Sequence, residues 1–132
     1  MPHEPLHKEL SYRIIGIAME AHREYGSGHK EVVYQKALEE KLAIAGIPFK
    51  AQPRIPVLSI NSGKTLGHYI PDILIDDRII LELKRTDFPI RIHEIQLRDY
   101  LKNTPYELGY VINFGCPSLY FKRVICSNQH QR

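Results

Sequence analysis

The residues best suited to chemistry lie in a short stretch of the sequence that runs from Pro71 to Lys84. Asp72 stands near the start of one apolar run, and Glu82 and Lys84 stand at the end of the next one. Side chains two positions apart share one face of a strand, so Glu82 and Lys84 are expected to lie side by side. Charges within apolar strands are costly unless they are paired or bind a metal ion, so this stretch is a candidate active site.

Two carboxylates on adjacent strands of a hairpin can converge on one divalent cation, and Mg²⁺ or Mn²⁺ prefers such hard oxygen ligands. A metal ion held by Asp72 and Glu82 would polarise a phosphoryl oxygen and lower the pKa of its water. Lys84 would orient that water and stabilise the charge of the transition state. These are the roles that phosphodiester hydrolysis requires. The alternative is an exposed ion pair between Glu82 and Lys84, with Asp72 as an ordinary strand-start residue.

A further carboxylate stands upstream in the pattern Gly28-x-x-Glu31-x-x-Tyr34. Glu31 lies three residues before Tyr34 and therefore heads the apolar stripe of a predicted helix, which puts a carboxylate on the core-facing side of its first turn. Helix capping offers another explanation, with Gly28 as N-cap and Glu31 as the third helical residue beside the positive helix end. Capping leaves Tyr34 on the same face unexplained.

A predicted helix downstream of the charged stretch carries His93, Gln96 and Tyr100 on one stripe. In the functional interpretation, Gln96 and Tyr100 face the carboxylates and contact a phosphate or a base. In the alternative, the stripe is only the solvated edge of an amphipathic helix.

Apolar periodicity and turn residues predict elements in the order α-α-β-β-β-β-α-β-β. The predicted helices cover residues 7–25, 29–45 and 90–102, and the predicted strands cover 49–52, 55–60, 65–75, 78–84, 108–114 and 119–125. Gly46 and Pro48 are expected to end the second helix, and Asp76-Asp77 to turn one strand into the next. The helix after Lys84 is expected to connect parallel strands. The fold class is therefore a mixed α/β fold, a central mixed sheet flanked by helices.

The composition is that of an ordinary globular chain, with 132 residues, 43% hydrophobic residues, 25% charged residues and a net charge of +3. This length predicts one domain over residues 7–126, with flexible tails at 1–6 and 127–132. No apolar run approaches the ~18–20 residues that span a membrane, and the first residues do not resemble a signal peptide. We therefore expect a cytoplasmic protein without a membrane partner.

Several motifs in order make the chain similar to a known family. Gly28-x-x-Glu31-x-x-Tyr34 is the signature after which the GxxExxY protein family is named. That family is placed in the PD-(D/E)xK nuclease-like superfamily, whose own motif is similar to Pro71-Asp72 followed by Glu82-Leu83-Lys84. Gln96-x-x-x-Tyr100 resembles the QxxxY element of RecB-like nucleases, and residues 109–115 and 121–125 look like the family's last two strands. The resemblance covers about residues 10–125 and implies a restriction-endonuclease-like core.

The resemblance also implies a role for each matching residue in a metal site. Asp72 and Glu82 would be ligands of Mg²⁺ or Mn²⁺, joined by the backbone carbonyl of Leu83. Lys84 would position the nucleophilic water. Glu31 would complete the acidic site from the helix, directly or through a water.

The expected substrate is a nucleic acid, DNA or RNA. Gln96, Tyr100 and Tyr34 are expected to line the cleft that binds it. A homodimer is one expected state, because many small nucleases cut both strands as dimers. The first hypothesis is thus a metal-dependent nuclease. The second is a non-catalytic module that retains the fold and binds nucleic acid or another protein, since fold alone does not settle function.

Overall fold

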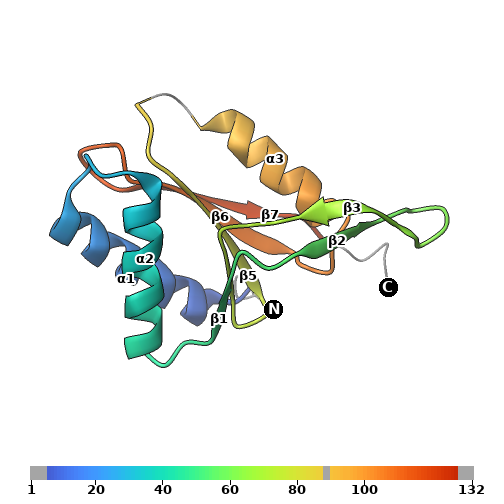
Figure 1. Ribbon diagram of the computed structural model, residues 1–132, viewed down its shortest axis with the longest axis horizontal. Helices are drawn as coiled ribbons and strands as arrows, with labels where there is room; N and C mark the ends of the chain where they lie inside the picture. Colours follow the sequence, from blue (N-terminus) through green and yellow to red (C-terminus); the bar gives the residue numbers. More distant parts are fainter. Residues whose placement is uncertain (1–5, 88–89, 128–132) are drawn as a thin grey trace, which may run out of the picture.

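The chain forms a mixed β-sheet with helices on both faces, in a computed structural model that describes residues 6–87 and 90–127 (Figure 1). The helices in that part of the chain are α1 (Lys8–Tyr25), α2 (Glu31–Ile44) and α3 (Arg91–Lys102). The strands are β1 (Phe49–Ala51), β2 (Ile55–Leu58), β3 (Thr65–Tyr69), β4 (Ile73–Ile75), β5 (Ile79–Lys84), β6 (Leu108–Asn113) and β7 (Tyr120–Ile125). The predicted fold class is confirmed.

Five strands form the central sheet in the order β1-β4-β5-β6-β7, and β2 and β3 form a separate hairpin. Neighbouring strands of the central sheet are antiparallel except β5 and β6, which run parallel and are joined through α3. The predicted helical connection between parallel strands is therefore confirmed.

The central sheet separates two hydrophobic cores. Leu81 and Leu83 of β5 are buried on the face that α1 and α2 cover, whereas Ile80 is buried in the core beneath α3. Because side chains alternate along a strand, Glu82 and Lys84 lie on the α3 face. The core positions of β5 thus decide which way the charged side chains point.

The single strand predicted over residues 65–75 is wrong, because the chain divides it into β3 and β4. β3 pairs with β2 in the separate hairpin, whereas β4 pairs with β1 and β5. Pro71 lies between the two strands and has no N–H to donate to a ladder. The break leaves Asp72 at the entrance to β4, outside the regular ladder, and it puts five strands before α3 where four were predicted.

The predicted N-cap of α2 is also wrong. The helix begins at Glu31, and its N-cap is Lys30, not Gly28. Lys30 has an extended backbone, with φ −69° and ψ 155°, so the helical turn that would make Glu31 its third residue does not form. The Glu31 carboxylate is consequently not explained by a capping box.

The two predicted turns are confirmed by their hydrogen bonds and backbone angles. The N–H of Gly46, a residue with φ 71°, donates to the Ala43 carbonyl at 3.1 Å, and the Ile47 N–H donates to the Leu42 carbonyl at 2.9 Å. These two bonds form a Schellman motif that ends α2. Asp76 and Asp77 turn the chain from β4 toward β5 with φ values of 50° and 53°, and the Arg78 N–H closes the turn by donating to the Ile75 carbonyl at 2.9 Å.

The remaining predicted helices and strands agree with the structure to within two residues at each end. Of the predicted tails, residues 1–5 and 128–132 lie outside the described residues, so flexible tails stay a prediction. In the described ranges no helix is both long enough and apolar enough to cross a membrane.

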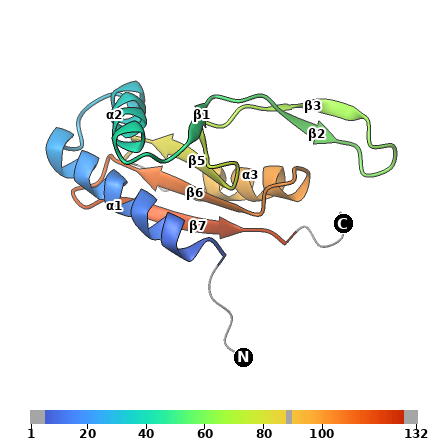
Figure 2. The same ribbon diagram turned by 90° about the horizontal axis from the view of Figure 1, so that it is seen from below.

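The hairpin of β2 and β3 projects beyond the central sheet in both views of the molecule (Figures 1 and 2). Its root is anchored by Ile55 and Tyr69, which are register partners and are buried in the core beneath α3. Toward its turn most side chains are exposed. We call residues 54–69 the β2–β3 ribbon.

Gly109 allows α3 to pack directly on β6. A Cβ added there would lie 2.9 Å from Cδ2 of Leu97 and 3.0 Å from the backbone oxygen of Ile80. We expect Gly109→Ala to lower the free energy of unfolding by about 1–3 kcal/mol, the usual cost of overpacking. Gly16 of α1 has nothing within 4 Å of its added Cβ, so Gly16→Ala should raise that free energy by about 0.5–1 kcal/mol. Urea denaturation measures both, and a Gly109→Ala protein as stable as the parent would contradict the packing argument.

Candidate active site

Asp72 and Glu82 face each other across the β4–β5 hairpin and exchange hydrogen bonds with its backbone. They occupy the next position in register beyond the Ile73–Leu81 pair. The Asp72 backbone N–H donates to Glu82 Oε1 at 3.1 Å, and the Leu83 backbone N–H donates to Asp72 Oδ2 at 2.7 Å. Side-chain oxygens therefore continue the hairpin where its regular ladder ends.

The two carboxylates are partly buried, and the Asp72 charge opposes the ionisation of Glu82. Burial is the main cause that raises the pKa of Asp72, and the Leu83 N–H and the Lys84 charge partly offset it. Burial also raises the pKa of Glu82, followed by repulsion from Asp72. A cation placed between the two groups would favour their charged forms.

Lys84 lies on the same face as Glu82, at the end of β5. Its charge acts on both carboxylates and lowers their pKa values. Among the described residues, however, Lys84 takes part in no ion pair within 4.0 Å. The alternative of a simple Glu82–Lys84 ion pair is therefore not what the structure shows, and the ammonium group can serve a third group beside the carboxylates.

Glu31 reaches the end of β5 from α2, on the opposite side of the sheet. Its Oε2 accepts a hydrogen bond from the backbone N–H of Arg85 at 3.2 Å. The Arg85 guanidinium donates from Nε to the Ser27 carbonyl at 2.9 Å, which ties the loop before α2 to the same strand end. The Glu31 charge also contributes to the raised pKa of Asp72. The structure thus brings Glu31 near the Asp72–Glu82 pair.

Tyr34 does not line an open cleft, and this corrects the expectation that it contacts the substrate. It is fully buried, and its ring stacks on Phe114 with centroids 4.3 Å apart. Its hydroxyl donates to the Gly26 carbonyl at 2.6 Å and accepts from the His29 N–H at 3.2 Å. Tyr34 therefore holds the loop that precedes α2, and through this loop it positions Glu31.

Tyr69 is a residue of the site that the sequence did not single out. It is 4% exposed and stacks on Tyr100 of α3, with ring centroids 3.8 Å apart and an angle of 8° between the rings. Burial, followed by the neighbouring Glu82 carboxylate, raises the pKa of Tyr69. Its buried hydroxyl has no hydrogen-bond partner of good geometry within the described part of the chain. An aromatic residue three positions before Asp72 has no distinctive spacing, so only the fold reveals it.

The two residues predicted to line the cleft differ in their surroundings. Tyr100 is half-buried and stacks on Tyr69, which lies between it and the carboxylate site. Gln96 is exposed on α3, one turn earlier in the helix. The fold therefore puts Tyr100 at the site and leaves Gln96 facing solvent near it.

Asn113 fixes the chain just beyond Lys84 and was also missed. It is the register partner of Lys84 on β6 and is 3% exposed. Its Oδ1 accepts from the Thr86 and Gly115 N–H groups at 3.1 and 2.9 Å, and its Nδ2 donates to the Thr86 carbonyl at 3.0 Å. A single polar residue at the end of the apolar run of β6 was the available signal.

The donor chemistry of the site fits a hard divalent cation. Asp72 and Glu82 each have one oxygen engaged by a backbone N–H, and both are more readily protonated than in solution. In residues 6–87 and 90–127, however, no three His, Cys, Asp or Glu residues form a group that could hold a metal ion. A cation here would depend on the two carboxylates together with uncharged oxygen donors such as water or substrate.

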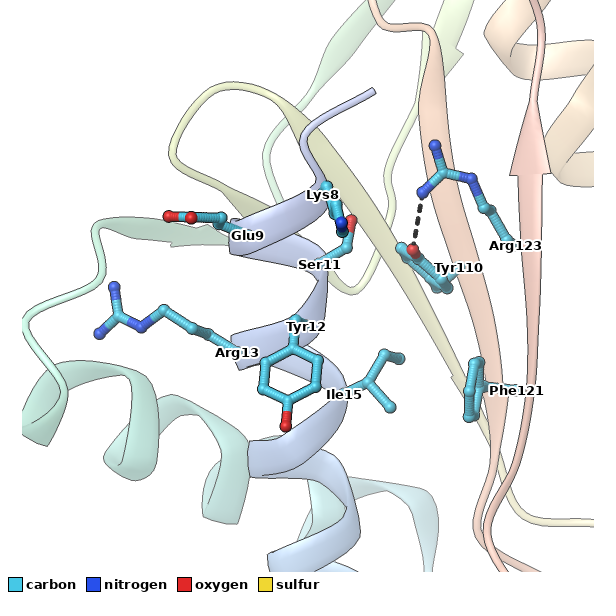
Figure 3. A pocket seen from close by; sticks show the side chains of 9 residues that line it. All are labelled: Lys8, Glu9, Ser11, Tyr12, Arg13, Ile15, Tyr110, Phe121 and Arg123. Atoms are coloured by element: carbon cyan, nitrogen blue, oxygen red, sulfur yellow. Dashed lines mark hydrogen bonds between the residues drawn. The ribbon is translucent and has the colours of Figure 1, made fainter. Parts of the chain in front are cut away.

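A separate hollow of about 660 Å³ lies between α1 and the β6–β7 pair (Figure 3). Phe121 and Tyr110 line it, and the Tyr110 hydroxyl accepts a hydrogen bond from Arg123 at 3.0 Å. Tyr110 is the register partner of Leu81, so the hollow opens on the face of the sheet opposite Glu82. It is not part of the carboxylate site.

Comparison with protein families agrees with this geometry. The family model described as the PD-(D/E)XK nuclease superfamily matches residues 8–124, which is most of the chain. The chain therefore belongs to the PD-(D/E)XK nuclease superfamily. Neither the curated proteins nor the solved structures gave a match.

The raised pKa of Glu82 leads to a prediction about stability. The Glu82 carboxyl keeps its proton to a higher pH in the folded protein than in the unfolded chain. The free energy of unfolding therefore falls as pH rises from the ordinary pKa of 4.5 through the raised pKa of the folded state. In a buffer with chelator, Glu82→Gln should therefore unfold at a higher urea concentration than the parent at pH 7. The difference should vanish below about pH 4, where both states of the parent are protonated.

The matched control is Glu40→Gln, on an exposed position of α2. It should follow the parent at every pH. A Glu82→Gln protein that is no more stable than the parent at pH 7 would show that the buried charge is compensated.

Proposed function

We propose that this protein is a Mg²⁺- or Mn²⁺-dependent nuclease that hydrolyses phosphodiester bonds in nucleic acid. The observation that carries the proposal is the Asp72–Glu82 pair, tied across the hairpin by backbone N–H groups, with Lys84 on the same face. Membership of the PD-(D/E)XK nuclease superfamily supports the same class of reaction. Superfamily membership alone does not define the reaction, because one fold can host several functions.

Asp72 and Glu82 would hold the metal ion in this proposal. When bound, a divalent cation would polarise a phosphoryl oxygen and lower the pKa of the attacking water. Binding of the cation would favour the ionised forms of the two carboxylates and so oppose the burial that raises the pKa of each. The backbone carbonyl of Leu83 is the proposed third protein donor, and Glu31 would contribute through a water.

Lys84 would orient the attacking water and stabilise the negative charge that builds on the phosphoryl group. The backbone just beyond Lys84 is held by hydrogen bonds between Asn113 and Thr86. Tyr100 and Gln96 would contact a phosphate or base from α3, with Tyr69 packed behind Tyr100.

A second function has one specific observation in its favour. Each carboxylate already accepts a hydrogen bond from the opposite strand, which is a structural role that needs no metal. The chain could then be a non-catalytic module that retains the nuclease fold and binds nucleic acid or protein. Its binding would be unaffected by chelator.

Nuclease assays on single- and double-stranded DNA and RNA test the first function. With Mg²⁺ or Mn²⁺ the parent should cleave at least one of these substrates, and Asp72→Ala and Lys84→Ala should each lose at least about 100-fold in rate. Glu40→Ala and Lys36→Ala, both at exposed positions of α2, should cleave like the parent. The proposal fails if no substrate is cut, or if the Asp72 and Lys84 variants cut as well as the parent.

Calorimetry with Mn²⁺ discriminates between the two functions. The nuclease should bind the ion and lose the signal in Glu82→Ala, while Glu40→Ala keeps it. Absence of metal binding in the parent, together with nucleic-acid binding that survives chelator, would favour the module.

A further inference from the structure

The β2–β3 ribbon lies in a long part of the sequence that has no acidic residue. No Asp or Glu stands between Glu40 and Asp72, although the chain has 15 of them among 132 residues. The ribbon itself carries Arg54, Lys64 and the imidazole of His68. The charge along the ribbon is therefore of one sign, which favours a polyanionic partner.

The two cationic side chains and the imidazole of the ribbon are accessible. Arg54, Lys64 and His68 are all exposed, and Arg54 Nη2 lies 3.2 Å from His68 Nδ1. Within the ranges that the structure describes, no carboxylate forms an ion pair with any of the three. The charges of Arg54 and Lys64 are thus not neutralised by a carboxylate within that part of the chain.

The face of the ribbon that is turned away from α3 combines these groups with exposed aliphatic side chains. Leu66 stands two positions before His68 and therefore shares its strand face, and Ile70 follows directly after the ribbon. They are 73% and 54% exposed, whereas Tyr69, at the alternate position, is buried beneath α3. This face is therefore open to a partner.

The shape of the ribbon suits a groove. It consists of two antiparallel strands that project from the body of the molecule, and neither strand pairs with the central sheet (Figures 1 and 2). A two-stranded hairpin has little stability of its own in water, so contact with a partner would add to it. The major groove of B-form DNA is about 12 Å wide and admits a two-stranded ribbon, whereas the corresponding groove of duplex RNA is too deep and narrow.

The ribbon also leads directly into the carboxylate site. β3 ends at Tyr69, whose ring lies beside Glu82, and Asp72 follows three residues later. A duplex held by the ribbon would therefore have its backbone close to the two carboxylates.

We propose that the β2–β3 ribbon docks in the major groove of double-stranded DNA and presents one strand to the Asp72–Glu82 site. Arg54 and Lys64 contact phosphates on the two sides of the groove, and the Leu66 face meets the base edges. The inference rests on the proposed function, since it names the substrate class of that site.

Fluorescence anisotropy tests the docking, with the full chain in chelator so that no DNA is cut. The probes are a duplex DNA of about two helical turns, one of its strands alone, and a duplex RNA of the same sequence. The parent should bind duplex DNA most tightly. Arg54→Ala/Lys64→Ala should weaken that binding about tenfold near 0.1 M salt and reduce the slope of log K against log salt by about 2.

The matched control is Arg23→Ala/Lys36→Ala, which removes two exposed cations from α1 and α2 and should leave both quantities unchanged. Thermal unfolding shows whether the ribbon variant is folded, and Leu66→Ser gives an independent change on the same face that should weaken binding without changing the salt slope. The proposal is overturned if both ribbon variants bind duplex DNA like the parent, or if the parent binds duplex RNA or the single strand as tightly as duplex DNA. It is also overturned if the ribbon variants change only self-association or binding to a protein.

Cleavage of a small phosphodiester, bis(p-nitrophenyl) phosphate, separates this inference from the proposed function. The ribbon variant should hydrolyse it at the parent's rate, because the small substrate needs no groove contact. If duplex binding is unaffected by the ribbon variants while this hydrolysis proceeds, the docking is wrong and the nuclease stands. If duplex binding depends on the ribbon but Asp72→Ala hydrolyses the diester like the parent, the docking stands and the proposed chemistry is wrong.

Discussion

The reciprocal hydrogen bonding of Asp72 and Glu82 across the β4–β5 hairpin is the constraint on which the site depends. Each carboxylate accepts a backbone N–H of the opposite strand, so burial of the two charges is partly compensated. A slip of one residue in the pairing would turn the side chains of one strand to the other face and separate Asp72 from Glu82. The apolar residues that alternate with them in β4 and β5 prevent this slip, because they fill the core under α1 and α2.

Other contacts bring distant parts of the chain to the same strand end. The loop before α2 is held by the buried Tyr34 hydroxyl, and its Glu31 carboxylate meets the Arg85 backbone. The exit from β5 is held by Asn113. On the other face, the Tyr69–Tyr100 stack joins the root of the ribbon to α3. In the Gly-x-x-Glu-x-x-Tyr pattern, the tyrosine thus shapes the loop before α2, and the glutamate faces the site.

The errors in prediction have a common physical origin. Residues 65–75 were predicted as one strand although Pro71 stands within them, and β3 and β4 find different pairing partners across the fold. Gly28 has the chemistry of an N-cap, but contacts of the loop with Tyr34 and Arg85 shift the helix start to Glu31. Tyr34 belongs to the motif and was taken for a cleft residue, because spacing alone does not distinguish a buried hydroxyl from an exposed one. In each case contacts between residues far apart in the chain decide the outcome.

The sequence by itself determined the kinds and order of most elements, the parallel crossover through α3, and the strand face shared by Glu82 and Lys84. These follow from periodicity and turn chemistry, which act over a few residues. Only the tertiary structure decided that the Asp72 and Glu82 side chains bond to each other's strands, that Glu31 arrives from the far side of the sheet, and that Tyr69 lies beside Glu82. Those facts depend on strand register and on the packing of helices against the sheet, which join residues far apart in the chain and therefore leave no local pattern to read.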